Sequence, residues 1–141
     1  VYELLADMGW QNQPIDLDHW LIEYCHSRYG SCPNAMQKAW KGLCRSVYSS
    51  LYSYPRFTWQ TVIPDTLRKS KYDFNDTYFR AVEDFLLCAP QLKDRPLYHS
   101  DALLFAAQYI GAKADNLYRK ALQAKAVGNR ARAKQLILPT D

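Results

Sequence analysis

The acidic side chains are the first candidates for catalysis, because paired carboxylates carry out glycoside and aspartyl chemistry. The chain contains only three glutamates, Glu3, Glu23 and Glu83, and each falls in a separate helical pattern without an acidic partner nearby. Asp16 and Asp18 stand where a helix is expected to begin, a position that the helix dipole favours for acids. We therefore expect no catalytic residue in this chain.

The stretch His99-Ser100-Asp101 contains the residue types of a hydrolytic triad. Consecutive residues of a helix point about 100° apart, so these three side chains cannot form the hydrogen-bonded series that a triad needs. We interpret the stretch as the polar first turn of a helix and reject the triad.

Four cysteines, Cys25, Cys32, Cys44 and Cys88, raise the questions of zinc and of disulfides. Structural zinc sites pair their ligands two to four residues apart, and neither these cysteines nor His26 show that spacing, so we expect no metal. No cofactor is expected either. If two helices flank a tight turn, Cys25 and Cys44 are offset by about 9 Å along the axis, too far for a disulfide. Reduced core cysteines are the expectation, and a Cys25–Cys32 bridge is the alternative.

An aromatic tract between residues 52 and 59 is the candidate binding surface. Aromatic faces bind the apolar faces of sugars or bases, and Arg and Gln side chains hydrogen-bond to hydroxyls. Arg56, Trp59 and Gln60 are therefore the candidate substrate-binding residues. The tract lies in a long segment without helical periodicity, and a loop of this length in a small domain is often functional. The alternative is that the rings only cover the open end of a bundle.

The segment 113–134 is strongly basic, with seven Lys or Arg residues and a single acid, Asp115. With the net charge of +4, this pattern suggests a nucleic-acid surface. On a helix, however, the basic side chains surround the axis instead of forming one stripe. We expect a solvated helix with Leu117, Tyr118 and Ala121 buried, and neither nucleic acid nor membrane as a partner. A stand-alone helical module that binds protein or nucleic acid through residues 113–134 remains the alternative function.

The rest of the chain shows mostly helical periodicity, which predicts an all-α fold. We expect an antiparallel helical bundle of about five to six helices in a single domain over residues 1–141, with one long irregular loop at about 53–75. Gly30 is expected to end the second helix in a left-handed conformation. The helices are expected over residues 1–9, 16–30, 31–51, 76–89 and 96–128, with a short helix or frayed tail over 129–138. The expected inward-facing residues are Leu17, Trp20, Leu21, Tyr24 and Cys25, then Trp40, Leu43, Cys44, Val47, Tyr48 and Leu51, then Phe79, Val82, Phe85 and Leu86.

The chain begins at Val1 without an initiator Met and is already in a helical pattern. Leu4, Leu5 and Met8 continue an apolar stripe, and no capping residue precedes it. We expect a piece of a longer protein, with part of the function outside these 141 residues.

Several stretches resemble one known family. In chain order they are Val1–Trp10, Asp16–Trp20, Ser27–Gly30, Ala39–Trp40, Arg45–Tyr48 and Asp76–Pro90. Taken together, these stretches are similar to the α-N-acetylglucosaminidases of glycoside hydrolase family 89. The resemblance covers residues 1 to about 95 well and the remainder loosely.

The resemblance implies a retaining, exo-acting hydrolase that removes terminal α-linked N-acetylglucosamine. Such enzymes carry both catalytic glutamates on a barrel domain and end in a helical domain, and this chain is similar to the first part of the latter. Neither catalytic glutamate has a counterpart here, so the isolated chain is expected to be inactive. The implied partners are the catalytic barrel domain of the same protein and a glycan ending in α-linked N-acetylglucosamine. The implied parent is exported or lysosomal.

Overall fold

The computed structural model describes residues 2–49 and 76–138, and every regular element in these ranges is a helix. The prediction of an all-α fold is therefore confirmed. The expected irregular loop at about 53–75 lies outside the described residues. Two compact units divide the described chain, one formed by residues 2–49 and 76–105 and the other by residues 106–138. A single domain over residues 1–141 stays a prediction.

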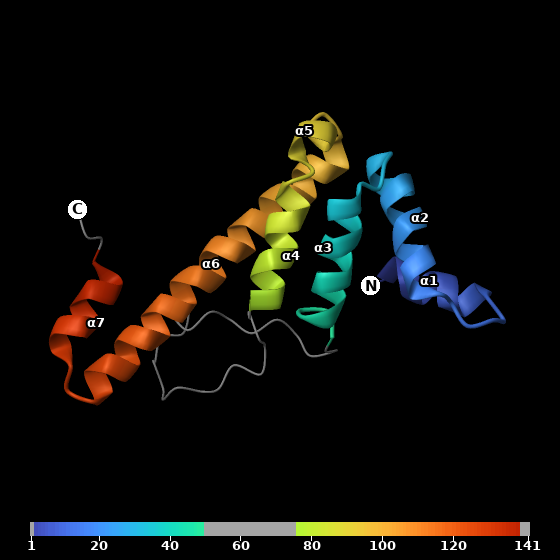
Figure 1. The fold of residues 1–141 in the computed structure, drawn as a ribbon. Helices are drawn as coiled ribbons and strands as arrows, with labels where there is room; N and C mark the ends of the chain where they lie inside the picture. The colour runs from blue at the N-terminus through green and yellow to red at the C-terminus, as the bar shows by residue number, and fades with distance from the viewer. Residues whose placement is uncertain (1, 50–75, 139–141) are drawn as a thin grey trace. The chain divides into compact units, whose positions relative to one another are not determined.

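Seven helices lie in the described ranges (Figure 1). They are α1 (Tyr2–Trp10), α2 (Leu17–Tyr29), α3 (Asn34–Arg45), α4 (Asp76–Leu86), α5 (Ala89–Leu92), α6 (Pro96–Ala126) and α7 (Arg130–Ile137). The helix that the sequence did not indicate is α5, which is a single turn of four residues. A single turn is too short to show a 3.6-residue period, so periodicity cannot detect it.

The starts and ends of α2 follow from local chemistry. Asp16 caps the helix, because its carboxylate accepts hydrogen bonds from the backbone N–H groups of Asp18 at 3.0 Å and His19 at 3.3 Å. At the other end, Gly30 has a φ of 77° and its N–H donates to the carbonyl of His26. Both ends match the sequence-based expectation, and Gly30 turns the chain into α3.

In the first unit, α2 and α3 form the expected antiparallel hairpin, and α3 packs extensively against α4 (Figure 1). The approach of α3 to α4 is close at Gly42. A Cβ atom added to Gly42 would stand 2.7 Å from the Cβ of Ala81. Glycine at this position therefore allows two helix backbones to approach more closely than any larger residue would permit.

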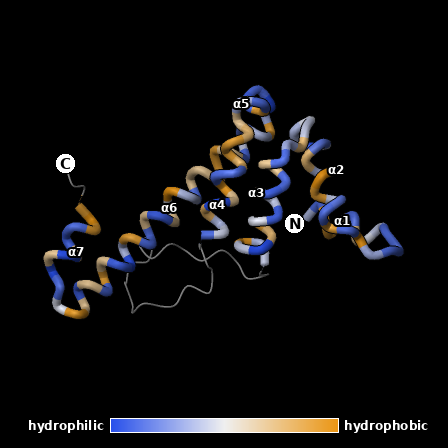
Figure 2. The backbone as a smooth tube through the Cα atoms, viewed as in Figure 1, coloured by the Kyte–Doolittle hydropathy of each residue, from blue (hydrophilic) through white to orange (hydrophobic). Residues whose placement is uncertain are grey.

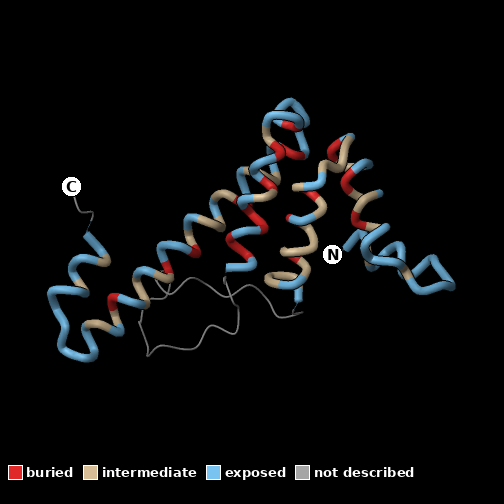
Figure 3. Tube along the Cα trace, in the orientation of Figure 1, coloured by how far each residue is buried: buried red, intermediate tan, exposed pale blue. Residues whose placement is uncertain are grey.

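The core of this unit is built largely from aromatic rings. Phe85 and Tyr98 stack with their centroids 5.0 Å apart, and Tyr29 meets both edge-on at 5.9 and 6.0 Å. The hydroxyl of Tyr98 donates to the carbonyl of Phe85 at 3.0 Å, so its polar end is satisfied inside the core. Much of α4 is buried, whereas α1 is exposed (Figure 3).

The expected inward stripe of α3 is too long. The helix ends at Arg45, because Ser46 leaves the helical region with φ −117° and ψ −99° and its hydroxyl donates to the carbonyl of Gly42 at 2.7 Å. Val47 and Tyr48 therefore lie half-buried in the turn that follows α3 and not on a helical stripe. Leu51 lies outside the described residues.

Some apolar residues that were expected to face inward are exposed. Leu17 is 41% exposed and Leu86 is 36% exposed, because each stands at the end of a helix where no neighbour covers it among the described residues. In α1, Leu5 and Met8 are both 55% exposed, and the helix has no buried residue. Leu5 and Met8 of the apolar stripe are therefore not covered by other described residues.

The second unit contains the remainder of α6 and α7. Hydrophobic and hydrophilic residues alternate along α6 (Figure 2), and Gly128, with φ 80°, ends its last turn. Asn129 then caps α7 by accepting from the N–H of Arg132 at 3.0 Å, so the predicted tail is a helix. The expected buried face was only partly right. Ala121 is buried and Tyr118 half-buried, but Leu117 is 47% exposed.

Three residues of this part of α6 are buried, namely Ala112, Asp115 and Ala121, which are 0%, 7% and 2% exposed. At about 100° per residue, Ala112 and Asp115 lie about 60° apart around the helix, whereas Ala121 lies opposite Ala112, so these buried residues do not share one face. Two small residues and one acid are thus buried, whereas the larger apolar Leu117 is exposed, which a hydrophobicity pattern would not predict. Asp115, the single acid of the basic segment, is thus buried, whereas most of the basic side chains around it are exposed.

Candidate functional site

The three predicted substrate-binding residues, Arg56, Trp59 and Gln60, lie outside the residues that the structure describes. Their role therefore stays a prediction. The described residues contain a different gathering of polar groups, formed by Arg28, Tyr29 and Asp101 in the first unit, which we call the Arg28 cluster.

The last turn of α2 and the early part of α6 position the Arg28 cluster. Arg28 donates from Nε to Oδ2 of Asp101 at 2.7 Å and from Nη2 to Oδ1 at 3.0 Å, a bidentate pairing. The hydroxyl of Tyr29 donates to Oδ2 of the same carboxylate at 2.8 Å. Both carboxylate oxygens of Asp101 are thus occupied by donors from two consecutive residues of α2.

The cluster is half-buried, which strengthens its interactions relative to the surface. The side chains of Arg28 and Asp101 are 26% and 17% exposed. The hydrogen bond to Asp101 raises the pKa of Arg28 above its ordinary value, and burial is the main cause that raises the pKa of Tyr29. Both groups therefore keep their protons across the physiological range, so they act as fixed donors and not as proton carriers.

Neighbouring groups extend the cluster toward α1 and the aromatic core. Glu3 places Oε1 3.8 Å from Nη1 of Arg28, and this carboxylate is 61% exposed. The guanidinium of Arg28 lies 5.9 Å from the ring centroids of both Tyr24 and Tyr29, a distance typical of cation–π contact. Arg28 thus connects α1, α2 and α6, and the chemistry available to this cluster is the positioning of helices.

The structure corrects the interpretation of His99-Ser100-Asp101 as merely a polar turn. His99 and Ser100 are exposed, whereas Asp101 is half-buried and faces α2. Arg28 stands in the last turn of α2, where basic residues are common, so its position was no signal of this contact. The sequence also could not reveal the partner, because Asp101 is far away along the chain.

A row of half-buried rings lies on the same unit. Trp20 stacks on Tyr24 at 5.1 Å, Tyr24 meets Trp40 edge-on at 5.2 Å, and Trp40 stacks on Tyr48 at 6.3 Å. The indole N–H of Trp20 donates to Asp7 of α1 at 2.7 Å. The indole nitrogen of Trp40 is buried and has no hydrogen-bond partner among the described residues. The row ends at Tyr48, which precedes by a few residues in sequence the segment that carries the predicted binding residues.

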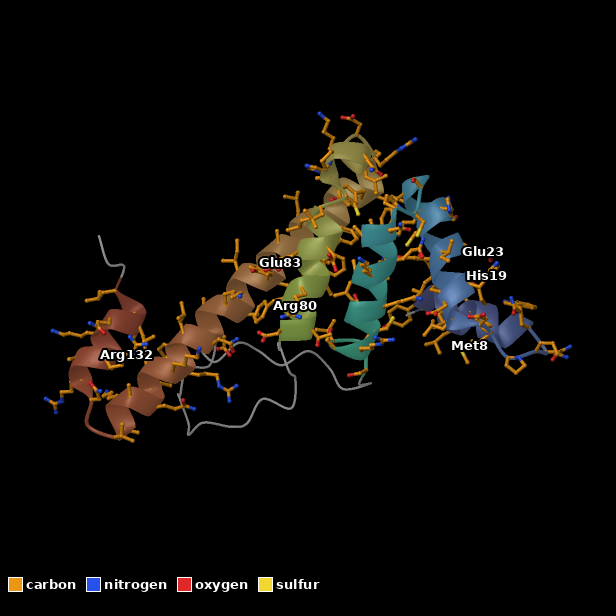
Figure 4. The ribbon with its side chains drawn as sticks, viewed as in Figure 1. Met8, His19, Glu23, Arg80, Glu83 and Arg132 are labelled. Carbon is orange, nitrogen blue, oxygen red and sulfur yellow. The ribbon has the colours of Figure 1, made fainter. Side chains whose placement is uncertain are left out.

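The other charged pairs of the first unit lie at its surface. Lys41 of α3 donates to Asp18 of α2 at 2.7 Å, so Asp18 joins the two helices of the hairpin as well as lying at a helix start. His19 and Glu23 lie one turn apart on α2, with Nε2 and Oε1 3.8 Å apart (Figure 4). Both side chains of this second pair are 69% exposed, so it contributes little to stability.

In the second unit, a lysine of the basic segment lies over an aromatic ring. Nζ of Lys113 lies 5.2 Å from the ring centroid of Tyr109, one turn earlier on α6. This places the ammonium over a ring of its own helix.

The cysteines of the described residues are not part of a metal site. All four cysteines are free, with Cys25 and Cys88 buried and Cys32 and Cys44 half-buried. Within residues 2–49 and 76–138, no group of three or more His, Cys, Asp or Glu side chains is arranged to hold a metal ion. The described helices also include none that combines the length and apolar character needed to cross a membrane.

Taken together, the described residues are all-helical and fall into two compact units, and a half-buried polar cluster joins helices of the first unit. A family model for the "Alpha-N-acetylglucosaminidase (NAGLU) C-terminal domain" matches residues 20–137. The chain belongs to this family, which confirms the family resemblance found in the sequence.

The chain is also similar to a curated protein of the same name as the family. The chain is 29% identical over 137 residues to an alpha-N-acetylglucosaminidase of Homo sapiens. The match covers 88% of this chain and 17% of that relative, so the chain spans far less than the length of the relative that it resembles.

Proposed function

We propose that this chain is part of the helical C-terminal domain of a retaining exo-α-N-acetylglucosaminidase, which hydrolyses terminal α-linked N-acetylglucosamine. The observation that carries this proposal is the family match over residues 20–137, which includes most of both described units. The similarity to a human protein of that name supports it. The chemistry takes place on a barrel domain of the same protein, and the helical domain supports that barrel.

The proposed role excludes catalysis by this chain alone. Retaining hydrolysis needs two carboxyl groups about 5 Å apart, one as nucleophile and one as acid/base. The three glutamates of the chain lie on α1, α2 and α4, and Glu3 and Glu23 are next to Arg28 and His19. The isolated chain is therefore inactive, and the catalytic glutamates belong to the barrel.

We further propose that the segment at about 53–75 forms part of the substrate pocket. Trp59 supplies an aromatic face for the apolar side of the sugar, while Arg56 and Gln60 hydrogen-bond to its polar groups. The half-buried row from Trp20 to Tyr48 supports this assignment, because it is an aromatic surface that ends a few residues before the segment in the sequence.

The test is an activity assay of the full-length protein with an aryl α-N-acetylglucosaminide. Hydrolysis with the α-anomer of the free sugar released first is the expected result, since a retaining mechanism preserves the configuration. Release of the β-anomer would contradict a retaining mechanism, and absence of hydrolysis would contradict the enzyme assignment. The 141-residue chain, assayed at the same concentration, is expected to show no hydrolysis.

The pocket assignment has its own test. Trp59→Ala and Arg56→Ala are each expected to lower kcat/KM by about tenfold or more, which corresponds to one lost contact of about 1.4 kcal/mol in the transition state. Arg132→Ala is the matched control, because Arg132 is exposed on α7 in the second unit (Figure 4). If Trp59→Ala and Arg56→Ala fold normally and keep the activity of the control, these residues do not contact the sugar.

A further inference from the structure

The first helix, α1, has a polar side and an apolar side, and its polar side contacts the rest of the first unit. Oε1 of Glu3 lies 3.8 Å from Nη1 of Arg28. Asp7 accepts a hydrogen bond from the indole N–H of Trp20 at 2.7 Å. Both of these partners belong to α2. At about 100° per residue, Leu5 points about 160° away from each of the two acids, so the opposite side of α1 is directed away from these contacts.

That opposite side is formed by Tyr2, Leu5 and Met8, which recur every three residues and span about 120° of the helix. These side chains are 88%, 55% and 55% exposed, and α1 has no buried residue (Figure 3). A helix as short as α1 is marginal by itself and is stabilised mainly by packing its apolar stripe. The contacts of α1 with α2 therefore leave out the side whose burial would stabilise the helix most.

We propose that Tyr2, Leu5 and Met8, which together we call the α1 face, dock on an apolar surface of the domain that precedes this one in the same protein. The inference rests on the proposed function for the identity of that domain, which is the catalytic barrel. Docking makes α1 the junction of the two domains, because its apolar side packs on the preceding domain while its acids contact α2.

The position of α1 relative to the family match selects this occupant. The match begins at residue 20, so α1 lies before the matched C-terminal domain, on the side where the rest of such a protein is joined. A domain that is joined to α1 through the chain has a much higher effective concentration than a second copy of the protein. Covalent connection therefore favours the preceding domain over self-association.

The chemistry of the α1 face indicates what kind of surface it meets. The face carries no charge, because the two acids of α1, Glu3 and Asp7, point to α2. An uncharged face has no group to pair with phosphates or with an acidic surface, and its binding free energy comes from the burial of apolar area. The complementary surface on the preceding domain is therefore apolar and able to receive a helix.

Docking also extends the Arg28 cluster beyond the first unit. Arg28 pairs with Asp101 of α6 and lies next to Glu3 of α1. The same guanidinium thus connects the junction helix to the edge of the aromatic core.

The first experiment uses the two methionines of this chain, one as the readout and one as the internal control. Met8 is 55% exposed and Met36 is 0% exposed. The native full-length protein is treated with hydrogen peroxide, and mass spectrometry compares the oxidation of each methionine with that in urea. Because oxidation follows exposure, Met8 is expected to react at least about tenfold more slowly in the native protein than in the unfolded protein. Oxidation of Met8 at the unfolded rate, while Met36 stays protected, would overturn the proposal.

The second experiment identifies what covers the α1 face. A phenylalanine analogue that carries a benzophenone is incorporated in place of Leu5 in the full-length protein, which is then irradiated and digested. The expected product is an intramolecular cross-link to a peptide of the preceding domain. A cross-link to a second copy, or to residues of this chain alone, would show that the occupant is a different one and would overturn the proposal.

Variants test whether the apolar side chains hold α1 in place. Leu5→Asp is expected to raise the oxidation rate of Met8 in the native protein by about tenfold, toward the unfolded rate, while Met36 remains protected and so shows that the unit is folded. Leu103→Asp is the matched control, because Leu103 is 61% exposed on α6 in the same unit, and it should leave Met8 protected. Protection of Met8 in Leu5→Asp, or equal loss of protection in both variants, would contradict docking through the α1 face.

None of these readouts needs enzymatic activity. Absence of hydrolysis in the assay of the full-length protein therefore overturns the proposed function without affecting the oxidation rates or the cross-link. Conversely, an active protein with an accessible Met8 would overturn only the docking of the α1 face.

Discussion

Asp101 of α6 accepts two hydrogen bonds from Arg28 of α2, at 2.7 Å from Nε and 3.0 Å from Nη2. The same carboxylate also accepts from the hydroxyl of Tyr29 at 2.8 Å. These contacts join the end of the second helix to a helix far along the chain, and they do so at the edge of the aromatic core. The polar cluster thus joins the helices next to the packed rings of Tyr29, Phe85 and Tyr98.

The first prediction concerns the carboxylate of this cluster. Asp101→Asn keeps the size of the side chain but removes its charge and one of its acceptors. We expect the free energy of unfolding to fall by about 1–2 kcal/mol, because hydrogen bonds to charged groups are lost at a half-buried site. Urea denaturation measures the change. The matched control is Asp18→Asn, whose 65% exposed carboxylate pairs with Lys41 and should change stability by less than about 0.5 kcal/mol. Equal effects of the two variants would contradict a structural role for the cluster.

The second prediction concerns the turn after α2. Gly30 has a φ of 77°, and a Cβ added there would stand 3.3 Å from the guanidinium carbon of Arg95. Gly30→Ala is therefore expected to lower the free energy of unfolding by about 1–2 kcal/mol, mainly through left-handed backbone strain. Gly9→Ala is the control, since Gly9 lies in α1 with nothing within 4 Å of an added Cβ, and it should be neutral or slightly stabilising. A neutral Gly30→Ala would show that the turn relaxes to another conformation.

The third prediction concerns the contact between α3 and α4. A methyl group at Gly42 would lie 2.7 Å from the Cβ of Ala81, so Gly42→Ala is expected to destabilise the protein by about 1–3 kcal/mol through overpacking. The double variant Gly42→Ala/Ala81→Gly moves the methyl group from one helix to the other and is expected to restore most of the loss. A double-mutant cycle from thermal or urea unfolding measures this coupling. Additive effects of the two substitutions would mean that the helices move apart, so that methyl groups at positions 42 and 81 do not occupy the same space.

The fourth prediction concerns alkaline pH. Burial raises the pKa of Tyr98 to about 12, whereas an unfolded tyrosine has a pKa of about 10. Below about pH 10 the stability from this group is fully present, and it is lost as the pH rises from about 10 toward about 12, because only the unfolded state releases the proton there. The loss for this residue is at most about 1.4 kcal/mol per pH unit.

Tyr98→Phe separates this titration from the rest of the protein. The variant loses the hydrogen bond to the carbonyl of Phe85 and should be about 1 kcal/mol less stable at neutral pH. Between about pH 10 and about pH 12, however, its stability should fall less steeply than that of the unmodified protein. Urea denaturation at about pH 8 and about pH 11 compares the two slopes. Identical slopes would show that Tyr98 does not hold its proton in the folded state.

Local features of the fold could be predicted because neighbouring residues determine them. The Asp16 cap, the left-handed Gly30 and the hairpin of α2 and α3 each depend on a few residues close together in the chain. The prediction failed where competing local contacts decide the outcome. The hydroxyl of Ser46 bonds back to Gly42 and the backbone leaves the helical region, so α3 ends before Val47 although the apolar pattern continues.

By itself the sequence determined the all-α class, most helix positions and the family, because periodicity, caps and ordered stretches of residues are properties of the chain alone. Only the tertiary structure identified Asp101 as the partner of Arg28 and Tyr29, and Ala81 as the neighbour of Gly42. Such pairs form between helices that are distant in sequence, and no repeat in the chain relates their positions. Their geometry follows from how the helices pack, which depends on the side chains of the whole unit at once.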